Sequence, residues 1–172
     1  MVDPQLVDAM PDSADVIVRL VVAALLGGVL GAEREFDGQD AGLRTHLLLC
    51  LGAALFGAIS VGGFADFVGD PGETNIQIDV TRVASYVAAG IGFIGGGTIL
   101  KHRGTVSGIT TATSLWTTAA VGLAMGLGFW VGALAATVLA LVALRGLKPV
   151  SNWLGRGRTE RSSDGDVSRG SP

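Results

Sequence analysis

Residues 82–116 read RVASYVAAGIGFIGGGTILKHRGTVSGITTATSLW, and this stretch decides the fold class. It opens as an apolar helix, runs into three successive glycines and a basic group, and continues with many hydroxyl side chains. Interior glycine weakens the helices and strands of a soluble core. In a bilayer the same glycines let helix backbones approach closely, and hydroxyl groups form hydrogen bonds between helices. The stretch therefore indicates a membrane protein.

The composition of the whole chain agrees with this interpretation. Of the 172 residues, 49% are hydrophobic and 27 are glycine, and the mean hydropathy is +0.53. Only 16% are charged, below the quarter that is typical of soluble domains. Cys50 is the only cysteine, which excludes an intramolecular disulfide and a cysteine-rich metal site. The acidic N-terminus predicts that there is no cleavable signal peptide.

Apolar blocks of about 20 residues predict an all-α fold, a polytopic bundle of about five transmembrane helices. Residues 1–15 are predicted to form an external tail, and residues 148–172 a cytoplasmic, mostly disordered tail. Between the third and fourth spans, residues 101–108 are expected to form a basic loop. The predicted spans within the membrane domain 16–147 are 16–32, 45–63, 81–100, 109–126 and 128–147.

The basic residues predict the orientation of the chain. They fall in three regions that five spans place on one side, so the positive-inside rule puts the N-terminus outside and the C-terminus in the cytoplasm. The acidic segment 64–80 then lies outside. Arg19, near the start of the first span, is predicted to snorkel to the interface, with an ion-pair role as the alternative.

Small residues recur at every fourth position in each predicted span. In membranes such rows mark the faces on which helices pack closely, so the spans are expected to form one bundle and the chain a homo-oligomer, with a dimer favoured. The candidate packing positions are Gly27, Gly31, Ala88, Gly92, Gly128 and Gly132.

Two charged clusters border the first connection, at residues 33–35 and 44–46. A helical hairpin brings them together, and charges against apolar runs are costly unless they are paired. We favour a buried Glu–Arg network over two alternatives, a carboxylate site for a cation or proton and ordinary interfacial charges. Asp79 and Arg82 have the spacing of a solvated i,i+3 ion pair. The candidate network comprises Glu33, Arg34, Glu35, Arg44, Thr45, His46, Asp79 and Arg82.

The glycine run has two interpretations. Gly95, Gly96 and Gly97 permit close packing, or they break the helix and free backbone carbonyls that, with Thr98, bind a cation. The following hydroxyl run, residues 105–118, predicts hydrogen bonds between helices. The chain has only two histidines, too few to indicate a transition-metal site, and no metal site is predicted.

Catalytic motifs are missing from the sequence, which carries no HExxH, phosphate-binding loop or nucleophile elbow. We therefore expect a protein that is not an enzyme. The C-terminal tail mixes basic and acidic residues, which favours anionic lipid over nucleic acid as its partner.

Three blocks resemble the signature regions of the MgtC/SapB family of bacterial membrane proteins. They are Gly31–Glu35, Ala41–His46 and residues 82–116, and the resemblance covers roughly residues 16–145. It implies a multi-pass protein of the bacterial or archaeal cytoplasmic membrane, linked to growth at low magnesium and, in pathogens, to intracellular survival and virulence. It also implies a regulator of a membrane complex such as F-type ATP synthase. Many members carry a soluble C-terminal ACT-like domain, which residues 148–172 are not expected to form.

Two functions are therefore considered. The first is a non-enzymatic regulator or adaptation factor that acts through helix contacts with itself or with a membrane complex. The alternative is an oligomeric transporter of Mg²⁺, another divalent cation or protons. Every acidic residue lies at the end of a span or in a loop, whereas Mg²⁺ is usually bound through one or more carboxylates. No cofactor is predicted, and Mg²⁺ is a candidate ligand only under the alternative.

Overall fold

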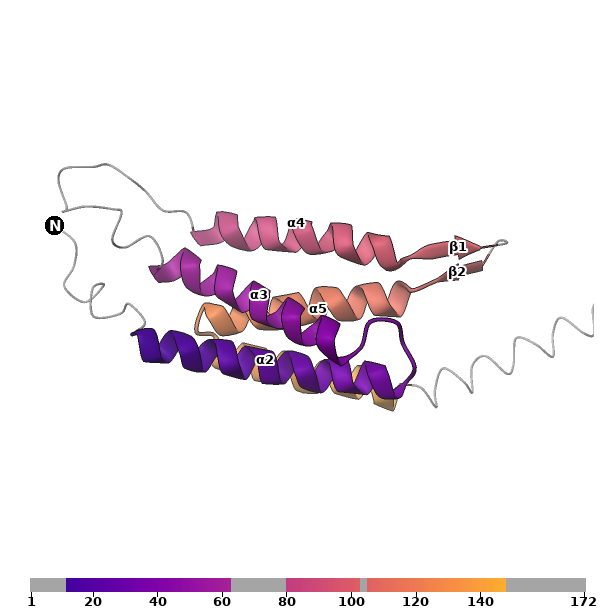
Figure 1. Cartoon of the computed structure of the whole chain (residues 1–172), viewed down its shortest axis with the longest axis horizontal. Coiled ribbons are helices and arrows are strands. Elements are labelled where there is room, and N and C mark those ends of the chain that lie inside the picture. Colours follow the sequence, from indigo (N-terminus) through magenta and orange to yellow (C-terminus); the bar gives the residue numbers. More distant parts are fainter. Residues whose placement is uncertain (1–11, 63–79, 103–104, 148–172) are drawn as a thin grey trace, which may run out of the picture. The chain divides into compact units, whose positions relative to one another are not determined.

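The computed structural model describes residues 12–62, 80–102 and 105–147. Of the predicted tails and the acidic segment 64–80, only residues 12–15 and 80 belong to the described residues. Asp79 lies outside them. Figure 1 shows the secondary structure. The elements are α2 (Ser13–Phe36), α3 (Leu43–Gly62), α4 (Val80–Thr98), β1 (Leu100–His102), β2 (Thr105–Ser107), α5 (Ile109–Gly126), α6 (Trp130–Leu141) and the π-helical turn η2 (Val142–Gly146).

The chain is a helical membrane protein. Among the described residues, α2 and α3 are long and apolar enough to cross a bilayer, and residues 130–146 form a shorter apolar helical segment. The 20 residues of α3 span about 30 Å, the thickness of the hydrocarbon core. Helices suit this environment because they satisfy their own backbone hydrogen bonds where no water is available.

Helices α2, α3 and α5 form the centre of the bundle. Helix α3 packs along both α2 and α5, while α4 packs mainly on α5 and touches α3 less (Figure 1). The main core is built largely from small side chains, which lets the helix backbones approach closely. Its buried members are Ala23, Cys50, Ala54, Val121, Met125 and Ala133.

The helix boundaries differ from the predicted spans at several ends. Helix α2 starts before residue 16 and continues beyond residue 32, because its charged last turn remains helical and partly buried. At the other end of the chain, the regular helix of the predicted span 128–147 stops at Leu141, and Val142–Gly146 continue as a π-helical turn. Hydrophobicity located the helices, but it predicted neither the polar ends of α2 nor the change to π-helical geometry after Leu141.

The predicted loop at residues 101–108 is wrong in part, because it contains a β-hairpin. Strands β1 and β2 pair antiparallel, with Leu100 opposite Ser107 and His102 opposite Thr105. The β-branched residues of β2 favour an extended backbone. Gly108 then turns the chain into α5 with a φ of +85°, and a Cβ there would meet the carbonyl of Thr98.

The turn between α5 and α6 corrects the interpretation of Arg19. The Arg19 guanidinium pairs with Asp15 at 2.5 Å and donates a hydrogen bond of 3.2 Å to the carbonyl of Gly126. Gly128 lies directly over it with a φ of +82°, and a Cβ at Gly128 would lie 2.8 Å from Arg19 Nη1. Arg19 therefore satisfies the C-terminal end of α5, the ion-paired alternative to snorkelling.

The chain divides into two compact units after Thr137, within α6. The helix packing above belongs to the first unit. The second is described for residues 138–147, which complete α6 and form the π-helical turn.

Candidate functional site

A buried polar network lies where α2 ends, α3 begins and α5 passes both helices. Glycines on α2 bring these backbones together: a Cβ at Gly31 would lie 2.8 Å from both the Gly42 carbonyl and the His46 Cβ. A Cβ at Gly27 would lie 2.6 Å from the His46 carbonyl and even closer to the Cys50 side chain. Any larger residue at either glycine would therefore separate α2 from α3.

Glu33 and Arg34 form the charged part of this network. Both are buried, with 4% of each residue exposed, and Arg34 Nη1 lies 3.7 Å from Glu33 Oε2. Within the described residues, Arg34 Nε is buried without a hydrogen-bond partner. A buried charge is costly unless it is paired, so removing either member of the pair is expected to destabilise the bundle.

The connection from α2 to α3 is held by Glu35. Its Oε2 accepts a 2.7 Å hydrogen bond from the backbone N–H of Leu43, the first residue of α3. A carboxylate at a helix N-terminus satisfies a free N–H group and interacts favourably with the helix dipole. Glu35 therefore caps α3 instead of taking part in the Glu33–Arg34 pair.

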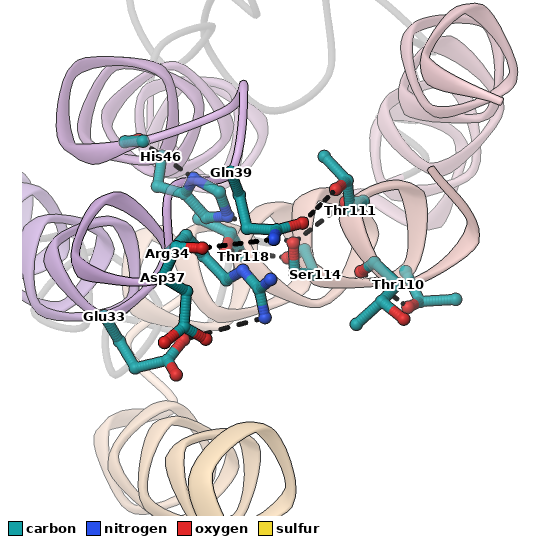
Figure 2. A network of polar contacts seen from close by, with 11 residues as sticks. Glu33, Arg34, Asp37, Gln39, His46, Thr110, Thr111, Ser114 and Thr118 are labelled. Atoms are coloured by element: carbon teal, nitrogen blue, oxygen red, sulfur yellow. Dashed lines mark hydrogen bonds and ion pairs between the residues drawn. The ribbon is translucent and has the colours of Figure 1, made fainter. Parts of the chain in front are cut away.

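His46 is the polar centre of the network and has no exposed surface. Its Nδ1 lies 3.0 Å from the Gly42 carbonyl, and its Nε2 lies 3.2 Å from the hydroxyl of Ser114 on α5. Figure 2 shows the imidazole ring pointing from α3 toward the hydroxyl groups of α5. A fully enclosed imidazole with a partner at each nitrogen links the α2–α3 connection to α5.

Hydroxyl groups of α5 complete the network in two ways. Thr111 donates to Gln39 Oε1 at 3.4 Å, and Ser114 contacts His46, so both join α5 to other parts of the chain (Figure 2). Other hydroxyls return to their own helix, among them Thr118, which donates to the Ser114 carbonyl at 2.8 Å. The hydroxyl run predicted to link helices therefore does so at particular positions.

The model of the MgtC family matches residues 20–153, most of the chain. The chain belongs to the MgtC family. The "Putative magnesium transporter YhiD" of Escherichia coli K12 is 40% identical over 132 residues, 77% of this chain and 60% of YhiD. MgtC of Salmonella typhimurium LT2 is 40% identical over 127 residues, 74% of this chain and 50% of MgtC.

Coverage differs among the MgtC-family relatives. The chain spans about three-fifths of the length of YhiD and half of MgtC. SrpB of Synechococcus elongatus is 38% identical, and the match covers 79% of this chain and 78% of SrpB. No solved structure matches the chain.

The MgtC-like charged blocks are only partly brought together. Glu33, Arg34 and His46 are buried, whereas Arg44 and Thr45 are exposed on the first turn of α3. Arg82 is exposed near the start of α4, and its proposed partner lies outside the described residues. The buried part of the predicted network is therefore smaller and includes Ser114, which was not a candidate.

The glycine run of this MgtC-family chain does not break its helix. Helix α4 continues through Gly95, Gly96 and Gly97 and ends at Thr98, whose hydroxyl donates to the Gly95 carbonyl at 2.7 Å. Gly95 faces Ala112 on α5, where a Cβ would be 3.5 Å from the Ala112 carbonyl. The proposed break is therefore wrong, because the helix retains its geometry through all three glycines.

The predicted packing positions lie in different surroundings. Gly27 and Gly31 are buried against α3, and Gly128 lies over Arg19. Around Gly132 the nearest side chain is Phe129 of the same segment. On α4, Ala88 and Gly92 are exposed, and a Cβ at Gly92 would meet nothing within 4 Å.

A sequence signal did exist for the buried residues of the network. The four-residue row that contains Cys50, Ala54 and Ala58 extends back one step to His46. A similar row on α5 consists of Ser114, Thr118, Gly122 and Gly126, all buried. Within the described residues, no group of three or more His, Cys, Asp or Glu side chains is placed to hold a metal ion.

Proposed function

We propose that this MgtC-family protein is a non-enzymatic membrane regulator or adaptation factor linked to magnesium limitation or intracellular survival. It acts through helix contacts with another copy of itself or with a membrane complex such as F-type ATP synthase. The observation that carries this proposal is the open side of α4.

Helix α4 leaves small and aromatic residues uncovered. A Cβ added at Gly90, Gly92, Gly96 or Gly97 would meet nothing within 4 Å. Phe93, in the middle of this stretch, is 86% exposed. In a bilayer such small-residue surfaces let a second helix approach closely. The surface is therefore suited to a helix from another chain.

The buried charged and polar groups support a structural role for the bundle of α2, α3 and α5. Glu33 contacts Arg34 within the bundle, and His46 contacts α5 through Ser114. These contacts hold α2, α3 and α5 together, while most of the described residues of α4 are exposed. A stable three-helix centre that carries a more exposed helix suits a protein that binds other membrane proteins.

We also propose that the chain is a multi-pass protein of the cytoplasmic membrane, with the N-terminus outside and the basic C-terminal tail beside anionic lipid. The support is the charge partition of the sequence. In a Cys50→Ser background, a cysteine introduced at residue 70 is expected to react from outside, and one at residue 103 only from inside. Equal reaction of both from one side would exclude the five-span orientation.

The experiment for the regulatory role compares two leucine substitutions in a bacterial host that lacks its own family member. Gly92→Leu places a large side chain on the open side of α4, so we expect lost growth at limiting Mg²⁺ with normal amounts of protein. Ala135→Leu, at an exposed position on α6, is the matched control and is expected to retain growth. Full growth with Gly92→Leu would contradict the role of this surface.

A transporter is the second candidate, favoured by the 40% identity to a protein named as a putative magnesium transporter. Vesicles containing the purified protein and a magnesium-sensitive dye separate the two functions. The regulatory proposal predicts no protein-dependent Mg²⁺ entry. Clear entry that is lost in a stably folded Glu33→Gln variant would establish transport in its place.

A further inference from the structure

The hydrogen bonds of His46 determine where its protons lie. Nδ1 is 3.0 Å from the Gly42 carbonyl, which can only accept a hydrogen bond. Nδ1 therefore carries a proton whether the imidazole is neutral or cationic. The remaining nitrogen, Nε2, is an acceptor in the neutral ring and a donor in the cation.

Ser114 is able to serve either state of Nε2. Its hydroxyl has one proton and two neighbours that can accept it, His46 Nε2 at 3.2 Å and the Thr111 carbonyl at 2.8 Å. With neutral His46, the hydroxyl donates to Nε2, and the Thr111 carbonyl retains the backbone bond of its helix. With cationic His46, Nε2–H donates to the hydroxyl oxygen, and the hydroxyl proton turns to the Thr111 carbonyl.

Charged residues of both signs lie on the elements packed against this pair. On α2, the buried Arg34 opposes a cation at His46, and its neighbour Glu33 favours one. Helix α5 contributes neutral hydroxyl groups. The titratable and charged groups on the elements packed around His46 are Glu33, Arg34 and Glu35 of α2, Asp37 and Asp40 of the connection, and Arg44 and Cys50 of α3.

A polar route joins the pair to the end of the bundle. Ser114 bonds to the Thr111 carbonyl, Thr111 Oγ1 donates to Gln39, and Gln39 Nε2 donates to the Asp37 carbonyl at 3.4 Å (Figure 2). Asp40, the next residue of the connection, is exposed. Hydrogen-bonding groups therefore extend from the fully buried ring to the solvent-exposed connection.

We propose that His46 and Ser114 form a reversible proton-binding site inside the helix bundle. A hydronium ion gives a proton to Nε2 and leaves as water, and the His46–Ser114 hydrogen bond reverses its direction. The Ser114 O–H bond is kept and turns from Nε2 to the Thr111 carbonyl. No covalent bond other than N–H forms. The site makes the contact between α3 and α5 sensitive to pH, and it does not depend on the regulatory role proposed above.

Histidine ¹⁵N chemical shifts of the full chain in lipid nanodiscs test the site directly. The His46→Gln variant assigns the signals, because His102 is the only other histidine. We expect neutral His46 to carry its proton on Nδ1 at high pH, and both nitrogens to be protonated at lower pH while the chain remains folded. A neutral ring protonated on Nε2, or a ring that gains a proton only on unfolding, would overturn the proposal.

Ser114→Ala tests the role of the hydroxyl. Without the hydroxyl, cationic His46 loses a charge-assisted hydrogen bond, whereas neutral His46 loses only a weaker neutral one. The titration midpoint of His46 is therefore expected to move about one unit lower, a roughly tenfold loss of proton affinity. Thr113→Ala is the control, because its exposed hydroxyl bonds to the Thr110 carbonyl of the same helix. An unchanged midpoint in Ser114→Ala would contradict the role of the hydroxyl. If that variant does not fold, the ¹⁵N measurement on the wild-type protein still tests the proposed tautomer of His46.

Discussion

Helices α4 and α5 carry similar rows of small residues but use them differently. On α5, Gly122 and Gly126 are buried, and a Cβ at either would overlap the backbone of α3, at Cys50 and Ala54. On α4, Gly92 and Gly96 are exposed and have open space around them. A spacing of four therefore identifies a face suited to helix packing without identifying the helix that occupies it.

The difference between α4 and α5 also predicts which substitutions affect folding and which affect binding to other chains. Close contacts between α3 and α5 hold one chain together, so substitutions there are expected to affect folding. The open row on α4 contributes little to the contacts within the chain, and substitutions there are expected to affect binding to other chains. The following predictions test this division.

The largest effect is expected for Gly122→Leu. The new side chain would collide with the backbone of α3 at Cys50, and backbone atoms cannot move aside without separating the helices. Folded protein should be lost in a detergent thermal-unfolding assay. Gly96→Leu makes the same chemical change in open space and should unfold at nearly the wild-type temperature, so equal loss in both variants would refute the comparison.

A smaller but substantial effect is expected for Glu33→Gln. It leaves the Arg34 charge buried, which should lower the free energy of unfolding by about 3 kcal/mol. The double variant Glu33→Gln/Arg34→Met should recover part of this loss, because an apolar pair replaces the charged one. A chemical-unfolding series of the three proteins measures both steps, and a single variant as stable as the wild type would show that the pair contributes nothing.

The smallest effect on stability is expected for Gly128→Ala in the α5–α6 turn. A left-handed backbone costs alanine about 1–2 kcal/mol, and the added methyl group would displace the Arg19 guanidinium. Gly52→Ala, where a Cβ meets nothing within 4 Å, is the control and should not be destabilised. Thermal unfolding of the two variants side by side should show a lower midpoint for Gly128→Ala alone.

Much of this architecture follows from simple properties of the sequence. Apolar blocks indicate the helices, and the predicted fourth span coincides with α5 at residues 109–126. The burial of Glu33 and Arg34 was expected from the cost of charges beside apolar runs. Both residues directly follow a long hydrophobic segment, and that position predicts their burial as a pair.

Tertiary contacts account for what the sequence did not predict. The interior position of His46 depends on Gly31 allowing α2 to approach it, and its bond to Ser114 joins residues far apart in the chain. The ion pair of Arg19 with Asp15 was the less favoured interpretation, because Arg19 lies close enough to the end of its span to snorkel. Its second partner is a backbone carbonyl at the end of α5. Backbone acceptors of this kind have no sequence signature.

Photo-crosslinking from α4 in living cells tests the central claim most directly. A benzophenone amino acid replaces Phe93, which is 86% exposed, and the same replacement of Trp116 on α5, 53% exposed, serves as the control. The account predicts that the Phe93 probe forms an adduct with a second copy of this chain or with a subunit of a membrane complex, identified by mass spectrometry, and that the Trp116 probe does so far less. Equal protein adducts at both positions, or none at Phe93, would contradict the assignment of α4 as the helix that binds other chains.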